Sequence, residues 1–140
     1  MSQDIQMQSN PIGNEIEQID SEFDAMLSDF LANGQHEYRT VQTKVCYFII
    51  KRIYRRVLVY GIDFGGIRID ITENLIIDGN HRYIAYKLAG FEFTVINGTK
   101  NHCDLHPFKS ISSIKIDKTC DWDMNHKDTI KYCNDDFLEI

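Results

Sequence analysis

The residues with the clearest chemical potential lie together in the middle of the chain, from Asp78 to Arg82. Three hydrophobic residues precede this run and an apolar-periodic segment follows it as far as Gly90, so the sequence predicts a buried strand, a tight turn and an amphipathic helix. The first turn of a helix has free backbone N–H groups and the positive end of the helix dipole, and can therefore hold an anion. Arg82 adds a planar guanidinium that suits phosphate or carboxylate oxygens.

Each residue of this turn has a candidate role in phosphate chemistry. Gly79 would allow a ligand to approach the backbone closely, and with Asn80, His81 and Arg82 it forms the predicted phosphate site. Arg82 could bind two phosphate oxygens, and His81 could bind a phosphate or shuttle a proton. The structural alternatives are a salt bridge from Arg82 to Asp78 and a helix-start role for His81. Occurring together in one turn, these residues favour the phosphate site.

Catalysis would need further groups, and two carboxylates flank the predicted hairpin. Either Glu73 or Asp78 could position a water molecule or Mg²⁺ if the protein hydrolyses or transfers phosphate. The catalytic candidates are therefore His81, Asp78 and Glu73.

No metal site is predicted from the remaining metal-ligating side chains. The histidines and cysteines of the second half fit no standard zinc module; they are His102, Cys103, His106, Cys120, His126 and Cys133. A carboxylate cluster could hold a hard cation, but solvated loop carboxylates are the favoured interpretation; it comprises Asp117, Asp121, Asp123 and Asp128.

Hydrophobic periodicity predicts the remaining elements. Apolar residues at helical intervals predict two N-terminal helices, and alternating residues predict strands, two of which form a hairpin that ends at the turn. The predicted helices are Pro11 to the Asn33-Gly34 stop, Glu37 to about Arg56 or slightly beyond, Asn80–Ala89 and Thr129–Leu138. The predicted strands are Ile67–Ile71, Leu75–Ile77, Phe91–Ile96 and Ile111–Ile116.

Two groups of charged residues have a functional and a structural interpretation. The first predicted helix carries acidic residues on its polar face, at Glu15, Glu17, Asp20, Glu22 and Asp24. A solvated face is favoured for them over an acidic partner site. Basic residues gather near the end of the second helix, at Lys51, Arg52, Arg55 and Arg56. The favoured interpretation is structural: these residues interact with the helix dipole and form a solvated patch. The functional alternative is an anion-binding wall beside the turn.

The run Ile76–Ala85 resembles the core motif of the ParB/sulfiredoxin superfamily. In that family a strand ends in a Gly-x-x-Arg-x-x-Ala turn, and the following helix cradles a nucleotide phosphate. Gly79, Arg82 and Ala85 match this spacing, and the run from Asp78 to Arg82 matches the Asp-Gly-x-His-Arg form of ParB-like members. The resemblance implies a nucleotide ligand, ATP or CTP, with Mg²⁺ as a companion ion. It also implies a nucleotide hydrolase, a phosphotransferase or a nuclease-type bacterial effector or toxin.

The sequence departs from the family in three respects. Sulfiredoxins carry a nucleophilic cysteine where this chain has Asn80, so that thiol chemistry is not expected. Chromosome-partitioning ParB proteins continue into a helix-turn-helix domain, for which the 44 residues after Ile96 leave little room. The opening strand that precedes the core in ParB proteins is also expected to be absent, with the segment Phe108–Ile116 as a candidate replacement.

Composition and charge limit the partners. The chain has 43% hydrophobic and 26% charged residues, as an ordinary globular protein does. Its net charge of -6 argues against broad binding to DNA or membranes, so a nucleotide is favoured over a nucleic acid. The N-terminus is polar, no apolar run approaches the ~18 residues that span a bilayer, and the four cysteines are scattered. We therefore expect a cytoplasmic protein, with signal-less secretion as an effector left open.

Together these features predict an α/β (α+β) fold: a small mixed β-sheet with flanking helices and a ParB/sulfiredoxin-like core preceded by an N-terminal helical pair. Residues 1–35 would form a tail and an acidic amphipathic helix, and residues 36–140 a ParB-like domain with its core at 41–96. The predicted function is nucleotide-phosphate binding, with or without turnover. The alternative is a non-catalytic interaction module, a regulator or immunity-type protein, whose acidic N-terminal helix binds a protein partner.

Overall fold

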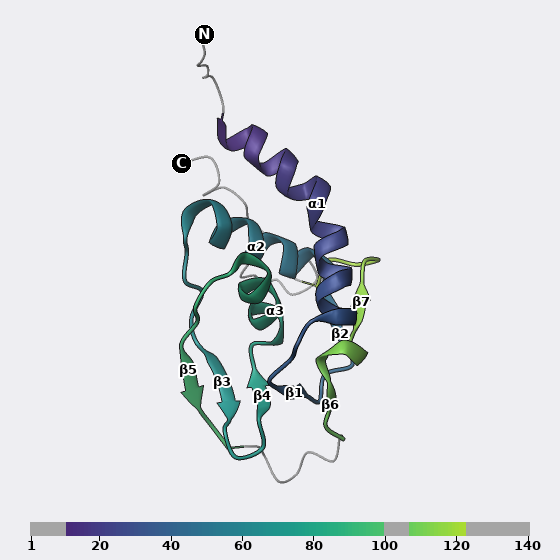
Figure 1. Ribbon diagram of the computed structural model, residues 1–140, viewed down its shortest axis with the longest axis vertical. Coiled ribbons are helices and arrows are strands. Elements are labelled where there is room, and N and C mark those ends of the chain that lie inside the picture. The colour runs from purple at the N-terminus through teal and green to yellow at the C-terminus, as the bar shows by residue number, and fades with distance from the viewer. Residues whose placement is uncertain (1–10, 100–106, 123–140) are drawn as a thin grey trace.

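The computed structural model describes residues 11–99 and 107–122. Within these residues helices and short strands alternate (Figure 1). In chain order they are α1 (Pro11–Asn33), β1 (Arg39–Thr40), β2 (Lys44–Cys46), α2 (Tyr47–Tyr60), β3 (Ile67–Asp70), β4 (Leu75–Asp78), α3 (Asn80–Ala89), β5 (Val95–Asn97), β6 (Lys109–Ser110), the 3₁₀ helix η2 (Ile111–Ser113) and β7 (Lys115–Asp117).

Five of the strands form one mixed sheet in the order β5-β3-β4-β1-β6, and they lie side by side across the lower part of Figure 1. The hairpin β3–β4 is antiparallel, whereas β5 joins β3 and β1 joins β4 in parallel. Strand β6 pairs with β1 in antiparallel orientation. Strands β2 and β7 form a separate parallel pair. The predicted fold class, a small α/β fold with a mixed sheet and flanking helices, is confirmed.

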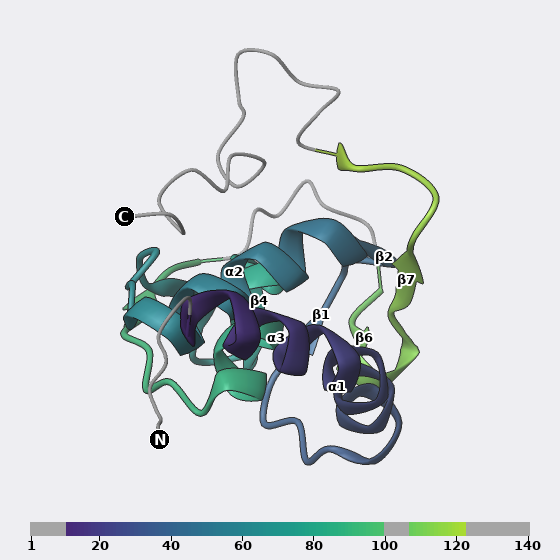
Figure 2. The same cartoon turned by 90° about the horizontal axis from the view of Figure 1, so that it is seen from above.

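The core lies between the sheet and the helices. The buried residues of the hairpin include Ile67 and Ile69 on β3 and Ile76 on β4. Helices α2 and α3 pack against each other above them. Figure 2 shows the three helices grouped over the strands, and α1 contacts both α2 and α3. Phe23 attaches α1 to α2, since its fully buried ring lies 5.5 Å from the ring of Tyr47 and 5.3 Å from that of Tyr54. Burial of apolar surface thus holds all three helices on the sheet.

Helix α3 has the predicted bounds, Asn80–Ala89, because a glycine flanks it at each end. Gly79 and Gly90 have φ angles of 108° and 69°, in the left-handed region that side chains other than glycine rarely adopt. The N–H groups of Gly90 and Phe91 donate to the last carbonyls of the helix, which closes its end. The predicted α1, its stop at Asn33, and the hairpin are confirmed as well.

The predicted helix from Glu37 to Arg56 is wrong in its first part. The chain forms β1 and β2 there, and α2 begins at Tyr47 and continues to Tyr60. Val41 and Val45 fit a helical interval, but the backbone on either side pairs with other strands instead. Strand β1 lies parallel to β4, beside the turn. A two-residue strand thus precedes residues 41–96.

The basic residues of α2 also differ from the favoured interpretation. They lie in the middle of the helix, and its last turn holds no basic residue, so the predicted contact with the C-terminal dipole is wrong. Two of them are not solvated: Arg56 is fully buried, and Arg52 is buried and donates to Asp121 at 2.7 Å. They do not line the pocket described below.

Two predicted strands are shorter than expected. The segment Phe91–Ile96 becomes a strand only at Val95, because Phe91 and Phe93 pack their rings against Tyr86 at centroid distances of 4.9 and 5.9 Å. The segment Ile111–Ile116 starts as the 3₁₀ turn η2, because the Ser110 hydroxyl accepts from the N–H of Ser112 and caps a turn.

Other expectations lie outside the described residues, among them the C-terminal helix Thr129–Leu138 and most of the loop before Phe108. Among the helices that the structure describes, none has both the length and the apolar character needed to cross a bilayer.

Candidate functional site

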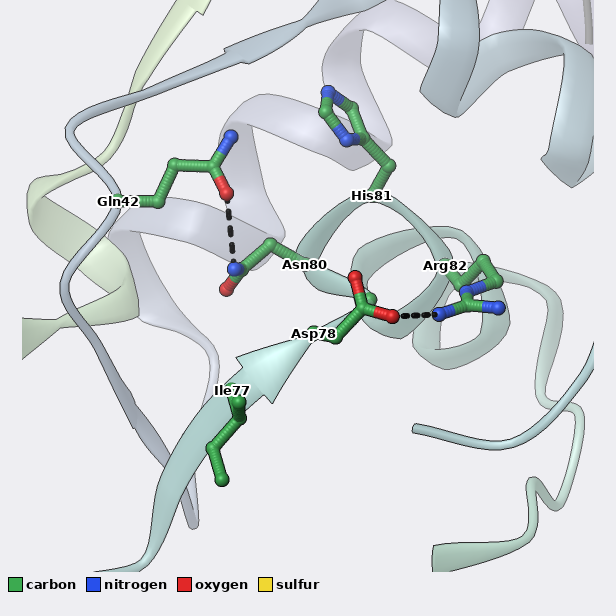
Figure 3. A pocket seen from close by; sticks show the side chains of 7 residues that line it. Gln42, Ile77, Asp78, Asn80, His81 and Arg82 are labelled. Carbon is green, nitrogen blue, oxygen red and sulfur yellow. Dashed lines mark hydrogen bonds and ion pairs between the residues drawn. The ribbon is translucent and has the colours of Figure 1, made fainter. Parts of the chain in front are cut away.

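A pocket of about 200 Å³ lies at the N-terminus of α3, where the strand β4 ends. We call it the α3 pocket; it is lined by Gln42, Ile77, Asp78, Gly79, Asn80, His81 and Arg82. Figure 3 shows the side chains of β4 and α3 around it, with Gln42 approaching from the opposite wall. The structure thus brings together all the residues of the predicted phosphate turn.

The backbone at this helix start is free to bind a ligand. Gly79 is the N-cap residue, and no side chain of the described residues caps the helix. The first backbone bond of the helix is donated by Tyr83 N–H to the Gly79 carbonyl at 2.8 Å. The N–H groups of Asn80, His81 and Arg82 precede it and have no intrahelical acceptor. They therefore give the pocket a set of donors at the positive end of the helix dipole.

Arg82 is held against the backbone of two glycines. A Cβ atom at Gly79 would lie 2.9 Å from Nη2 of Arg82, and one at Gly65 would lie 3.3 Å from Nη1. Both glycines have positive φ angles, 108° and 111°, so the backbone conformation and the space each require a residue without a side chain. The guanidinium therefore lies close to the backbone of both glycines, at the edge of the pocket.

The polar contacts of this guanidinium are long. Nη2 donates to Asp78 Oδ2 at 3.3 Å, and Nη1 donates to the Phe64 carbonyl at 3.4 Å. The predicted alternative for Arg82, a salt bridge to Asp78, is therefore present. However, 74% of the Asp78 side chain is exposed, and an ion pair with so exposed a partner contributes little. A phosphate group could replace this carboxylate at small cost.

Asn80 joins the helix start to the loop between β1 and β2. Its Oδ1 accepts from the Thr40 hydroxyl at 2.9 Å, and its Nδ2 donates to Gln42 Oε1 at 3.0 Å. The Thr40 hydroxyl in turn accepts from the Gln42 N–H at 3.0 Å. Because both ends of the Asn80 amide are engaged, its side chain builds the wall, and its backbone N–H is what remains for a ligand.

His81 is a neutral part of the wall. Its Nε2 accepts a hydrogen bond from the Cys46 N–H at 2.8 Å, so the ring proton is on Nδ1. Burial, with the positive charge of Arg82 nearby, lowers the pKa of His81 to about 4. A proton shuttle at neutral pH needs a pKa near 7, so this environment favours a fixed N–H donor over an acid–base role.

Residues distant in the sequence also hold this wall, and the periodicity gave no sign of them. The Trp122 ring meets that of His81 edge-on at 5.4 Å, and its Nε1 donates to Asp117 at 2.9 Å. Hydrogen bonds from Thr119 and Trp122 lower the pKa of Asp117 to about 2. Gln42 and Thr40 could have been suspected only if the strand β1 had been recognised.

None of the other candidates that the structure describes lines the pocket. Glu73 precedes β4, at the end of the strand opposite Asp78, and contacts Arg39 at 3.5 Å. Asp78 is the one carboxylate among the described residues that line the pocket. The Asp117 carboxylate accepts a hydrogen bond from the Thr119 hydroxyl, and the Asp121 carboxylate accepts one from Arg52. No group of three metal-ligating side chains occurs in the described part of the chain. Except for Cys120, the zinc candidates lie outside that part.

The loop that touches Arg82 depends on Tyr86. The Tyr86 hydroxyl accepts from the Phe64 N–H at 2.9 Å and donates to the Gly65 carbonyl at 2.9 Å. In Tyr86→Phe both backbone groups lose this partner, and we expect a loss of about 1–2 kcal/mol in the free energy of unfolding. Urea unfolding monitored by circular dichroism measures it.

Tyr38→Phe is the matched control for this substitution. Tyr38 packs edge-on against Tyr83, and its hydroxyl has no hydrogen-bond partner among the described residues. Its removal should change the stability by less than about 0.5 kcal/mol. Equal losses in the two variants would show that the Tyr86 hydroxyl does not support the loop.

In comparisons with family models, curated proteins and solved structures, this chain matched none of them.

Proposed function

We propose that this chain is a ParB-like domain that binds a nucleotide through its phosphate groups in the α3 pocket. The observation that carries the proposal is the combination of a helix start without a side-chain cap and a guanidinium close beside it. Backbone N–H groups and a planar fork of donors together match the oxygens of a phosphate. The motif resemblance adds ATP or CTP as the candidate nucleotides.

Asp78 is the residue that would bring a metal ion to such a complex. Mg²⁺ is commonly bound by one or two carboxylates together with substrate phosphates, and keeps several waters. Asp78 lines the pocket with an exposed carboxylate, so its donor chemistry fits this arrangement. The ion would neutralise phosphate charge, while Arg82 and the helix start orient the phosphate group.

Binding without turnover is the second candidate, and the state of the wall favours it. The His81 ring is neutral and bonded to the backbone, and the Asn80 amide is engaged at both ends. This leaves Asp78 as the candidate base among the described pocket residues. A regulator or immunity-type protein could use such a pocket to sense a nucleotide.

A thermal-shift series tests the proposal. ATP, CTP, GTP and ADP, each with and without Mg²⁺, are added to the full chain. We expect at least one triphosphate to raise the melting temperature, since a ligand at a hundred times its Kd stabilises the folded state by about 2.7 kcal/mol. The absence of a shift with every nucleotide would overturn the proposal. Release of labelled phosphate then separates a hydrolase from a sensor.

A further inference from the structure

A second hollow, lined by lysines, lies beside the α3 pocket. It has a volume of about 520 Å³, and we call it the lysine hollow; it is lined by Thr43, Lys44, Lys109, Ser113 and Lys115. It is built where the parallel pair β2–β7 meets the edge strand β6 of the main sheet. The N–H of Lys115 donates to the Thr43 carbonyl at 2.9 Å and ties the two sides together.

Two of the three lysines are opposite each other on the paired strands that form one side of the hollow. Lys44 and Lys115 are register partners on β2 and β7, and like charges directly opposite on paired strands destabilise a sheet. Among the described residues, neither these two nor Lys109 forms an ion pair. The positive charge of Lys44 helps to lower the pKa of Asp117, but the Asp117 carboxylate accepts hydrogen bonds from Thr119 and Trp122. An anion in the hollow would relieve the repulsion.

Two links in the backbone join the lining of the hollow to the lining of the α3 pocket. Gln42 lines the pocket and Lys44 lines the hollow, so at most about 7 Å of extended backbone separates the two residues. Lys109 is the register partner of Thr40, whose hydroxyl binds Asn80 in the pocket wall. A ligand longer than one nucleotide could therefore occupy both.

The charge of the whole chain conceals this basic surface. Residues 1–38 contain eight Asp and Glu and no Lys or Arg. Residues 39–122 contain thirteen Lys and Arg against eight Asp and Glu, a net charge of +5. The net charge of -6, which disfavours nucleic acid, is the sum over the whole chain, whereas a local basic surface decides the binding of a polyanion.

We propose that the lysine hollow is a subsite for the sugar–phosphate backbone of a single-stranded nucleic acid whose terminal phosphate occupies the α3 pocket. This rests on the proposed function, because the α3 pocket supplies the first phosphate position. The substrate class then becomes an oligonucleotide, with the three lysines contacting successive phosphates. A single strand fits, because one terminal phosphate in the pocket continues into one backbone.

Fluorescence anisotropy of a 3′-labelled oligothymidylate tests this proposal on the full chain. The 5′-phosphorylated strand should bind more tightly than the strand without that phosphate. In K44Q/K109Q/K115Q the affinity should fall at least about tenfold. The slope of log K against log salt should fall by about 2, since each phosphate contact on a single strand contributes about 0.7. The thermal shift with mononucleotide should stay unchanged.

The control K51Q/K87Q/K118Q removes the same charge from lysines that line neither site. It should bind the strand like the unchanged protein. An equal loss in both triple variants would overturn the proposal in favour of a net-charge effect. Competition by polyglutamate equal to that by oligonucleotide, or equal binding of a duplex, would also overturn it.

The two proposals can fail separately. A lysine-dependent affinity with no mononucleotide shift and no effect of Arg82→Ala would overturn the phosphate pocket and leave the backbone subsite. A mononucleotide shift lost in Arg82→Ala, with strand binding unaffected by the lysines, would overturn the subsite alone.

The stability of K115Q without ligand gives an independent readout. Loss of the repulsion from Lys44 should raise the melting temperature while strand binding weakens. A lowered melting temperature would mean that Lys115 supports the fold, and would overturn the proposed role.

Discussion

Replacing Arg82 with alanine is expected to weaken nucleotide binding about a hundredfold and to preserve the fold. A hydrogen bond from a charged donor contributes about 1.5–3 kcal/mol, and a bidentate pair contributes two of them. A loss of about 3 kcal/mol corresponds to roughly a hundredfold in Kd. Among the described residues, the polar contacts of Arg82 are the long ones to Asp78 and Phe64, at 3.3 and 3.4 Å, so its removal breaks no strong interaction there. The Kd of the best nucleotide, measured by calorimetry, checks the prediction.

Two further substitutions sharpen this measurement. Arg82→Lys keeps the positive charge but not the planar fork, and should recover only part of the affinity. Arg39→Ala removes an exposed arginine that contacts Glu73 at the opposite end of β4, and should leave the Kd unchanged. If Arg39→Ala weakened binding as much as Arg82→Ala, the ligand would not sit at the start of α3.

The features of the fold that the sequence predicted well are those set by local chemistry. Helix α3 lies between two glycines with positive φ angles, so its ends are encoded where they occur. The hairpin before it follows from alternating isoleucines, of which Ile67 and Ile69 are buried. The polar turn between β4 and α3 lies between these two elements, so its residues necessarily gather in one place.

The features that escaped prediction depend on contacts between distant segments. Strand β1 has two residues, and its pairing with β4 and the bond from Thr40 to Asn80 hold it in place. Neither partner can be read from the local pattern, in which Val41 and Val45 fit a helix as well. The same limit applies to the lysine hollow, because Lys44 and Lys115 are 71 residues apart and meet only through the pairing of β2 with β7.

The chemistry of the turn residues also depended on these contacts. From the sequence His81 is a candidate proton shuttle, since an unperturbed histidine titrates near neutral pH. In the fold, β2 supplies the Cys46 N–H to its Nε2, and Trp122 covers its ring. Asn80 is similarly engaged by Thr40 and Gln42. Residue type thus predicted where the candidate pocket lies, whereas the neighbouring residues decide which atoms in it remain for a ligand.

The environment of His81 should make the protein sensitive to mild acid. Its pKa is lowered to about 4 by burial and by Arg82, whereas in the unfolded chain it should be near 6.5. Above pH 6.5 the ring is neutral in both states, so this group adds no pH dependence. Between pH 6.5 and 4 the unfolded state binds a proton that the folded state does not, so the free energy of unfolding decreases as the pH is lowered. The full loss corresponds to about 3 kcal/mol.

His81→Gln isolates this contribution, because glutamine does not titrate and its carbonyl can still accept from the Cys46 N–H. Urea unfolding of both proteins should give a stability difference that is constant above pH 6.5. From pH 6.5 to 4 the unchanged protein should lose about 3 kcal/mol relative to the variant. Asp117, with its pKa of about 2, titrates in both proteins and cancels in the difference. A difference that stays flat down to pH 4 would mean that His81 takes up its proton in the folded state. The wall would then carry a positive charge in mild acid, and nucleotide affinity should rise as the pH falls.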